Sequence, residues 1–134
     1  MSTMVVPAPP GSTPSAAAAK ALRRAARSLR CLPFRRAFYE EVDGQAMAAT
    51  ELCARGDWAR LVFAPFGTER AEAHFRWLIL LGVLRREVDG QGLTERVRLT
   101  PMGRQLLASW NGEVPRAGLQ ERIQENFRRH RPRF

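Results

Sequence analysis

The chain has 134 residues, of which 45% are hydrophobic, and it carries a formal net charge of +9. This length predicts about one domain with one core, and the basic excess favours a polyanionic partner, either nucleic acid or an acidic protein surface. The longest apolar run, residues 77–84, is too short to cross a membrane, and the N-terminus lacks the pattern of an export signal. We therefore expect a cytoplasmic protein with no membrane association.

The basic excess lies at the two ends of the chain. The first 36 residues hold seven basic residues and no acidic one, while residues 116–134 hold six arginines and two glutamates. Proline, glycine and serine dominate residues 1–15, which predicts a disordered tail. We expect a folded domain over residues 16–112, followed by a basic, partly helical C-terminal tail over residues 113–134. The basic ends fit a polyanionic partner, and they fit solvated tails equally well.

The first predicted helix begins at Ala16 and ends before Pro33. Leu22, Ala26 and Leu29 repeat at helical spacing and define an apolar side. The remaining side is cationic, so the helix is amphipathic. The basic side chains on it are Arg23, Arg24, Arg27 and Arg30.

Two further helices are predicted next, one ending near Asp43-Gly44 and one spanning residues 46–54. Together they could form the front of a helix-turn-helix. Residues 58–67 are apolar but contain a proline and a glycine, which predicts a helical turn or short strand and then a loop. Thr68 is predicted to cap the following helix, which Gly82 ends.

A β-hairpin is predicted directly after that helix. Residues 83–88 and 93–99 have strand character, and Asp89-Gly90 begins the turn between them. Thr100 is then a suitable N-cap and Pro101 a suitable first residue for a last helix. The order of helix, hairpin and capped helix predicts an α+β fold, specifically a winged helix-turn-helix with an additional N-terminal amphipathic helix.

Two sequence patterns resemble known families. Phe75, Leu78 and Gly82 with the following Val83-Leu84, together with LTPMGRQLL at residues 99–107, resemble the recognition helix, wing and closing helix of bacterial winged-helix regulators. More narrowly, LRCLPFRRAFYE (29–40) and residues 80–106 are similar to a small cyanobacterial family of proteins of about this size. The resemblance covers about residues 20–110 and implies a bacterial cytoplasmic protein, but that family brings no established activity.

The winged-helix resemblance implies binding to double-stranded DNA and a role as a transcriptional regulator. The helix from Thr68 would enter a major groove, and the wing would contact the backbone. Arg96 and Arg98 alternate with apolar residues, so both should point off the outer face of the wing, with Arg85 and Arg86 on the neighbouring strand. The predicted nucleic-acid-binding residues are Arg70, His74, Arg76, Arg85, Arg86, Arg96 and Arg98.

Two features of the predicted recognition helix oppose DNA binding. Glu69 and Glu72 would be repelled by phosphates, and Trp77, Ile79 and Leu80 give the helix more apolar surface than its core stripe needs. The N-terminal helix, a second copy of the chain or another protein could cover that surface. The alternative function is therefore an adaptor that binds an acidic or ribonucleoprotein surface through its Arg-rich helix and tails. The predicted interaction residues are Arg23, Arg24, Arg27, Arg30, Trp77, Ile79 and Leu80.

Catalysis is the function class that the sequence supports least. No Gly-rich phosphate loop follows a strand, no nucleophile elbow is present, and the adjacent Glu40 and Glu41 would diverge on a helix. Cys31 and Cys53 show no metal-ligand spacing, so two reduced thiols are expected. We predict no enzyme activity, no cofactor and no metal.

Overall fold

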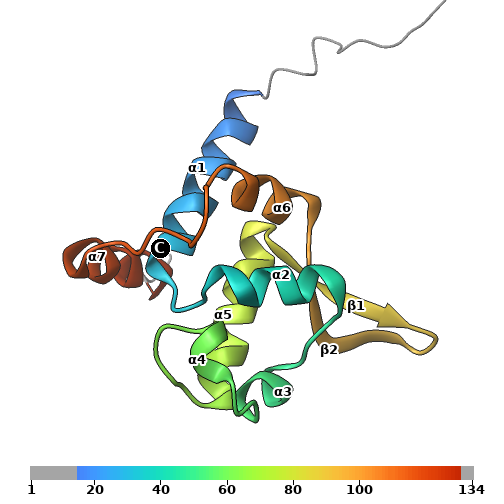
Figure 1. Ribbon diagram of the computed structural model, residues 1–134. Helices are drawn as coiled ribbons and strands as arrows, with labels where there is room; N and C mark the ends of the chain where they lie inside the picture. The colour runs from blue at the N-terminus through green and yellow to red at the C-terminus, as the bar shows by residue number, and fades with distance from the viewer. Residues whose placement is uncertain (1–14, 131–134) are drawn as a thin grey trace, which may run out of the picture.

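The computed structural model describes residues 15–130, and the predicted disordered tail, residues 1–15, lies almost entirely outside the described residues. Figure 1 shows a helical body with a β-hairpin that projects from one side. The helices are α1 (Ala16–Cys31), α2 (Arg36–Gly44), α3 (Ala49–Cys53), α4 (Trp58–Leu61), α5 (Thr68–Leu81), α6 (Pro101–Ala108) and α7 (Leu119–His130). Two antiparallel strands, β1 (Leu84–Asp89) and β2 (Gly92–Leu99), form the hairpin, so the described fold is of mixed α+β composition.

Helix α1 confirms the predicted N-terminal helix. The Ser15 side chain accepts a hydrogen bond from the backbone N–H of Ala18 at 3.0 Å, which caps the helix. The helix ends at Cys31, two residues before Pro33. Ala25, Ser28 and Leu29 are its buried residues, so α1 packs one face against the body of the fold.

The centre of the core is aromatic. The ring of Phe34 stacks on that of Phe38 with 4.4 Å between centroids, and Phe38 stacks on Phe75 of α5 at 5.8 Å. All three side chains are fully buried. Because Phe34 precedes α2 and Phe75 lies in the middle of α5, this stack fixes α2 across α5.

Helix α3 is shorter than the predicted helix over residues 46–54. The chain before it is extended, and Met47 forms an isolated antiparallel bridge with Val97 of β2. The backbone N–H groups of Met47 and Val97 each donate to the other residue's carbonyl, at 3.2 and 2.9 Å. This exchange of bonds ties the start of α3 to the hairpin and removes these residues from the helix.

The start of α5 also differs from the prediction. Thr68 is the first helical residue and not the cap; Gly67 takes the N-cap position without a side-chain hydrogen bond. The Gly67 carbonyl instead accepts from the N–H of Ala71 at 3.0 Å, so the backbone begins the helix one residue earlier than predicted. The other end follows the prediction, because Gly82 adopts a left-handed conformation with φ of 89°.

The hairpin and the helix that follows it confirm their local sequence signals. Leu84 pairs with Leu99 and Arg85 with Arg98, with an irregularity between Arg86 and Val88. The Thr100 hydroxyl accepts from the N–H of Gly103 at 3.1 Å and caps α6.

Helix α7 lies in the segment that the sequence assigns to a basic tail, and it packs beside the C-terminal end of α1 (Figure 1). Val114 and Ala117 in the connection to it are buried, and the N–H of Ala117 donates to the Arg30 carbonyl at 2.8 Å. This connection therefore belongs to the packed body of the fold. Among the helices of the described chain, none has the length and apolar character needed to cross a bilayer.

Candidate nucleic-acid interface

Three of the predicted arginines share the outward face of the hairpin. Arg85 of β1 and Arg98 of β2 are direct cross-strand partners, and Arg96 lies two residues from Arg98 on the same face. Like charges placed opposite each other destabilise a sheet. Glu87 forms an ion pair with Arg98, whereas Arg85 and Arg96 have no ion pair within residues 15–130. This face therefore carries uncompensated positive charge.

Arg86 lies on the opposite face from those three residues. It pairs with the buried Val97, and because side chains alternate along a strand, it points toward α5. Its guanidinium forms an ion pair with Glu72 of α5 and donates to the Glu95 carbonyl at 2.7 Å. Arg86 thus joins the hairpin to α5 and is not available to phosphates on the outer face.

The exposed side of α5 carries both charge signs. Arg70 and Glu69 are exposed. The Arg76 side chain is 63% exposed, although its guanidinium lies 3.7 Å from the Glu72 carboxylate. Because Arg86 neutralises Glu72, one of the two acids that opposed DNA binding is already paired within the fold. Glu69 remains the acid at this surface.

His74 faces inward from α5. Its ring lies edge-on to those of Phe34 and Phe66, with 5.7 and 5.5 Å between centroids. Burial, together with the nearby charges of Arg129, Arg70 and His130, lowers the pKa of His74 to about 4. The structure therefore places His74 beneath the surface near α7, apart from the outward arginines of the hairpin.

The three apolar residues predicted as an interaction surface have different environments. Trp77 is half-buried, and its indole N–H donates to the Ser28 hydroxyl of α1 at 3.1 Å. The guanidinium groups of Arg24 and Arg129 lie over the same indole, 5.4 and 5.6 Å from its centroid. Ile79 packs against the core, whereas Leu80 is 61% exposed. Trp77 is therefore covered within the same chain, by Ser28 and Arg24 of α1 and by Arg129 of α7.

Two of the four predicted α1 arginines pair with glutamates of α7. Arg30 makes two hydrogen bonds to Glu121, at 3.0 and 2.8 Å, and Arg27 lies 3.4 Å from Glu125. These partners were not predicted from the sequence. The sequence does contain a signal for these ion pairs. Glu121 and Glu125 are one helical turn apart in an otherwise basic segment, and this spacing matches that of Arg27 and Arg30 on the facing helix.

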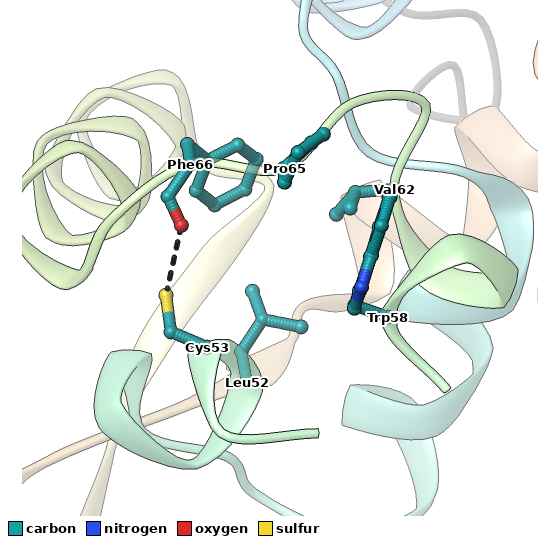
Figure 2. Close-up of a pocket in the computed structure, with 6 residues that line it drawn as sticks. All are labelled: Leu52, Cys53, Trp58, Val62, Pro65 and Phe66. Atoms are coloured by element: carbon teal, nitrogen blue, oxygen red, sulfur yellow. Dashed lines mark hydrogen bonds between the residues drawn. The ribbon is translucent and has the colours of Figure 1, made fainter. Parts of the chain in front are cut away.

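A small apolar pocket of about 170 Å³ lies between α3, α4 and the loop before α5. Figure 2 shows Leu52, Val62 and Pro65 around it, with the indole of Trp58 on one side. The Cys53 thiol donates to the Phe66 carbonyl at 3.5 Å. None of the described residues that line this pocket is charged, so they offer no cation that would recognise an anion.

The described residues contain no cluster of three or more histidine, cysteine, aspartate or glutamate side chains that could hold a metal ion. Comparison with protein families matches residues 15–129 to the family described as Npun_F0494-like. The match agrees with the narrower of the two resemblances found in the sequence, and it does not bear on the winged-helix one. No curated protein and no solved structure matches the chain.

Proposed function

This chain belongs to the Npun_F0494-like family, and we propose that its described part is a winged-helix domain that binds double-stranded DNA. The element order supports the fold assignment. Helices α2, α3 and α5 precede the hairpin, and the isolated bridge between Met47 and Val97 lies where a short third strand would pair with a wing. In such a domain α5 would be the recognition helix and the β1–β2 hairpin the wing.

The observation that carries the proposal is the pairing of Arg85 with Arg98 on the outward face of the hairpin. Glu87 pairs with Arg98, but Arg85 opposite it and Arg96 beside it have no acid partner within residues 15–130, and such uncompensated like charges destabilise a sheet. A DNA phosphate beside Arg85 and Arg96 would replace this repulsion with charge-assisted hydrogen bonds. We assign backbone contacts to Arg85 and Arg96, while Arg98 stays paired with Glu87.

Helix α5 would contribute fewer contacts than the hairpin. Arg76 is its most suitable residue, because its side chain is exposed and the acid beside it is paired with Arg86. Leu80, on the same exposed side, could contact a thymine methyl group. Since Glu69 repels phosphate, we expect weak base selectivity and an affinity that comes mainly from backbone contacts.

The test is the salt dependence of binding to a fluorescent duplex, measured by anisotropy for the full chain and for an R85A/R96A variant. These two arginines have no ion pair within the described structure, so removing them leaves no unpaired acid. Each lost phosphate contact should reduce the slope of log K against log salt by about 0.9, so the double variant should lose about 1.8.

A matched control is R104A, because Arg104 of α6 forms an exposed ion pair with Asp43 of α2 and is not one of the arginines of the hairpin face. It removes one positive charge, and any change in slope that it causes measures the general effect of net charge. Failure of the full chain to bind duplex DNA at low salt would overturn the proposal, as would an R85A/R96A slope equal to that of the unmodified chain.

A second candidate function, self-association, is favoured by the outward face of α7. Leu119, Ile123 and Phe127 are 66%, 50% and 75% exposed and form one stripe at four-residue spacing. The stripe is symmetric about Ile123, so two copies of α7 packed antiparallel would place Leu119 against Phe127 of the other copy. Neutral side chains border it, including Gln120 and Asn126, and they would not repel a second copy.

Light scattering over a range of protein concentrations tests this second candidate. We expect a concentration-dependent dimer that an I123E variant converts to monomer, because two glutamates would then meet on the two-fold axis. A Leu80→Glu variant is the control, since Leu80 is also an exposed apolar residue but belongs to α5. A mass that stays monomeric at the highest concentration rules the dimer out.

A further inference from the structure

A polar hollow lies between the first two turns of α5 and the last two turns of α7. Its volume is about 430 Å³, within the range of small-ligand sites. Glu69, Arg70 and His74 line it from α5, and Asn126, Arg129 and His130 line it from α7. In Figure 1, α5 lies between α7 on one side and the hairpin on the other, so this hollow is separate from the outward face of the hairpin.

Arg129 reaches the hollow without a carboxylate partner. Its guanidinium donates to Nδ1 of His74 at 3.1 Å, and it has no ion pair within residues 15–130. The charge of Glu125 acts on it, but that carboxylate already accepts hydrogen bonds from Ser28, Arg27 and Arg128. Burial and the charge of Arg70 lower the pKa of Arg129, as expected for a cation that lacks a counter-ion.

The hydrogen bond from Arg129 also fixes the form of His74. A guanidinium can only donate, so Nδ1 of His74 must accept and the ring must be neutral. The remaining ring proton is then on Nε2, which makes His74 a hydrogen-bond donor as well. The hollow is therefore lined by two arginines, a neutral imidazole and the Asn126 amide.

Among the described residues that line the hollow, Glu69 is the only acid, and it is exposed at the first turn of α5. Two guanidinium charges exceed this one negative charge. The free backbone N–H groups at the start of this 14-residue helix add to the positive potential. The balance of charge in the hollow therefore favours an anion, although Glu69 reduces that preference.

We propose that the hollow between α5 and α7 binds a phosphate-type dianion, held between the guanidinium groups of Arg70 and Arg129. Arginine is suited to this task because its planar fork matches two oxygens of a phosphate group. The site goes beyond the proposed DNA contacts of the hairpin and uses none of their residues. Its phosphate would come from a small phosphorylated compound or from a nucleic-acid backbone.

Nuclear magnetic resonance of the full chain provides a direct test, because the chain contains only two histidines. The His74 signal is followed as pH falls, in sodium sulfate and in sodium chloride at equal ionic strength, and is assigned with a His74→Gln variant. Sulfate is the first probe because it stays a dianion across this range, and pyrophosphate is the second, at pH 7. A bound dianion should raise the pKa of His74 in sulfate and shift its signal in pyrophosphate.

Two variants separate this site from general charge effects. Arg70→Gln changes an exposed residue and should weaken pyrophosphate binding about tenfold, the usual loss for one charge-assisted contact. Arg129→Gln should do the same if it folds. Arg23→Gln removes one exposed charge from α1 and should leave binding unchanged.

The result that overturns the proposal is a His74 titration that is the same in sulfate and chloride, with no pyrophosphate shift. Equal weakening by Arg23→Gln and Arg70→Gln also overturns it, because binding would then reflect net charge alone.

A competition experiment identifies the source of the phosphate. If duplex DNA displaces pyrophosphate from the unmodified chain and from R85A/R96A, but not from Arg70→Gln, the phosphate belongs to a nucleic-acid backbone. If duplex DNA does not displace it, the ligand is a small phosphorylated compound.

Discussion

The indole N–H of Trp77 donates to the hydroxyl of Ser28 at 3.1 Å, and that hydroxyl in turn donates to the carboxylate of Glu125. Ser28 and Glu125 are both buried, at 0% and 3% exposure. A serine hydroxyl can donate once while it accepts, so one side chain satisfies a group from each neighbouring helix. This chain of bonds links α5, α1 and α7.

We expect Glu125→Ala to lower the free energy of unfolding by about 2 kcal/mol, because the buried Ser28 hydroxyl loses its acceptor and three hydrogen bonds disappear. The loss should stay below that of a fully buried ion pair, since Arg27 and Arg128 can regain water. Urea unfolding monitored by circular dichroism measures it.

The matched control is Glu121→Ala, one turn earlier on α7. Glu121 pairs with Arg30 at the surface, where screening by water makes such pairs worth little. We therefore expect a clearly smaller loss than for Glu125→Ala. Equal losses for the two variants would show that the buried bonds to Ser28 add nothing to the attachment of α7.

Gly103 is required by the close approach of α6 to the turn before the hairpin. A Cβ atom at this position would lie 2.5 Å from Cδ1 of Leu99 and 2.8 Å from the Val83 carbonyl oxygen. The carbonyl belongs to the backbone and cannot move away cheaply, so we expect Gly103→Ala to destabilise the fold by about 2 kcal/mol. Thermal unfolding of this variant measures the loss.

Gly44→Ala is the control, because a Cβ there would have no atom within 4 Å and Gly44 is the last residue of α2. Its midpoint should stay within a few degrees of the unmodified chain, or rise slightly. If both alanine variants melt at the same temperature, steric exclusion is not the reason for glycine at position 103.

The sequence predicted the elements whose signals are local. The hairpin follows from Asp89-Gly90 between two strand-like runs, α6 from Thr100 and Pro101, and the end of α5 from Gly82. In each case the residues that set the structure lie within a few positions of it. The extended residue Met47 escaped prediction because its partner, Val97, is 50 positions away and only the folded chain brings them together.

The candidate site was predicted less completely for the same reason. Alternation along a strand placed Arg96 and Arg98 on one face, but the bond of Arg86 to Glu72 depends on how the hairpin lies against α5. His74 resembled a surface residue of a recognition helix, and only the docking of α7 sets it against Arg129. Residues 113–134 have tail-like composition, which says nothing about Glu121 and Glu125 meeting α1.

Tyr39 is fully buried, and its hydroxyl has no hydrogen-bond partner among the described residues. Burial raises the pKa of Tyr39 well above its usual value, so the group stays neutral. An unpaired buried hydroxyl costs free energy, and we expect Tyr39→Phe to leave stability unchanged or raise it by up to about 1 kcal/mol. Denaturant unfolding gives the difference.

Tyr39→Leu is the comparison, because it also removes the ring that meets Phe34 and Phe38 edge-on, at 6.1 and 5.3 Å. That loss of packing should cost about 1–3 kcal/mol. A Tyr39→Phe variant that is less stable by more than 1 kcal/mol would mean that the hydroxyl has a partner, such as an ordered water molecule.

The last prediction concerns the pH dependence of stability, which follows from the lowered pKa of His74. This pKa is about 4 in the folded chain against a usual value of 6.5, so the unfolded chain binds more protons between these limits. Stability from this group is therefore complete above pH 6.5 and is lost as pH falls toward 4, by about 3 kcal/mol at most. Surface carboxylates with lowered pKa values, Glu41 and Glu113 among them, add their own loss of stability only below about pH 4.5.

Free energies of unfolding measured from pH 7 to pH 5 should thus fall for the unmodified chain and stay nearly level for His74→Gln, which cannot take up the proton. Parallel curves for the two proteins would show that His74 is not the neutral, buried acceptor of the Arg129 hydrogen bond.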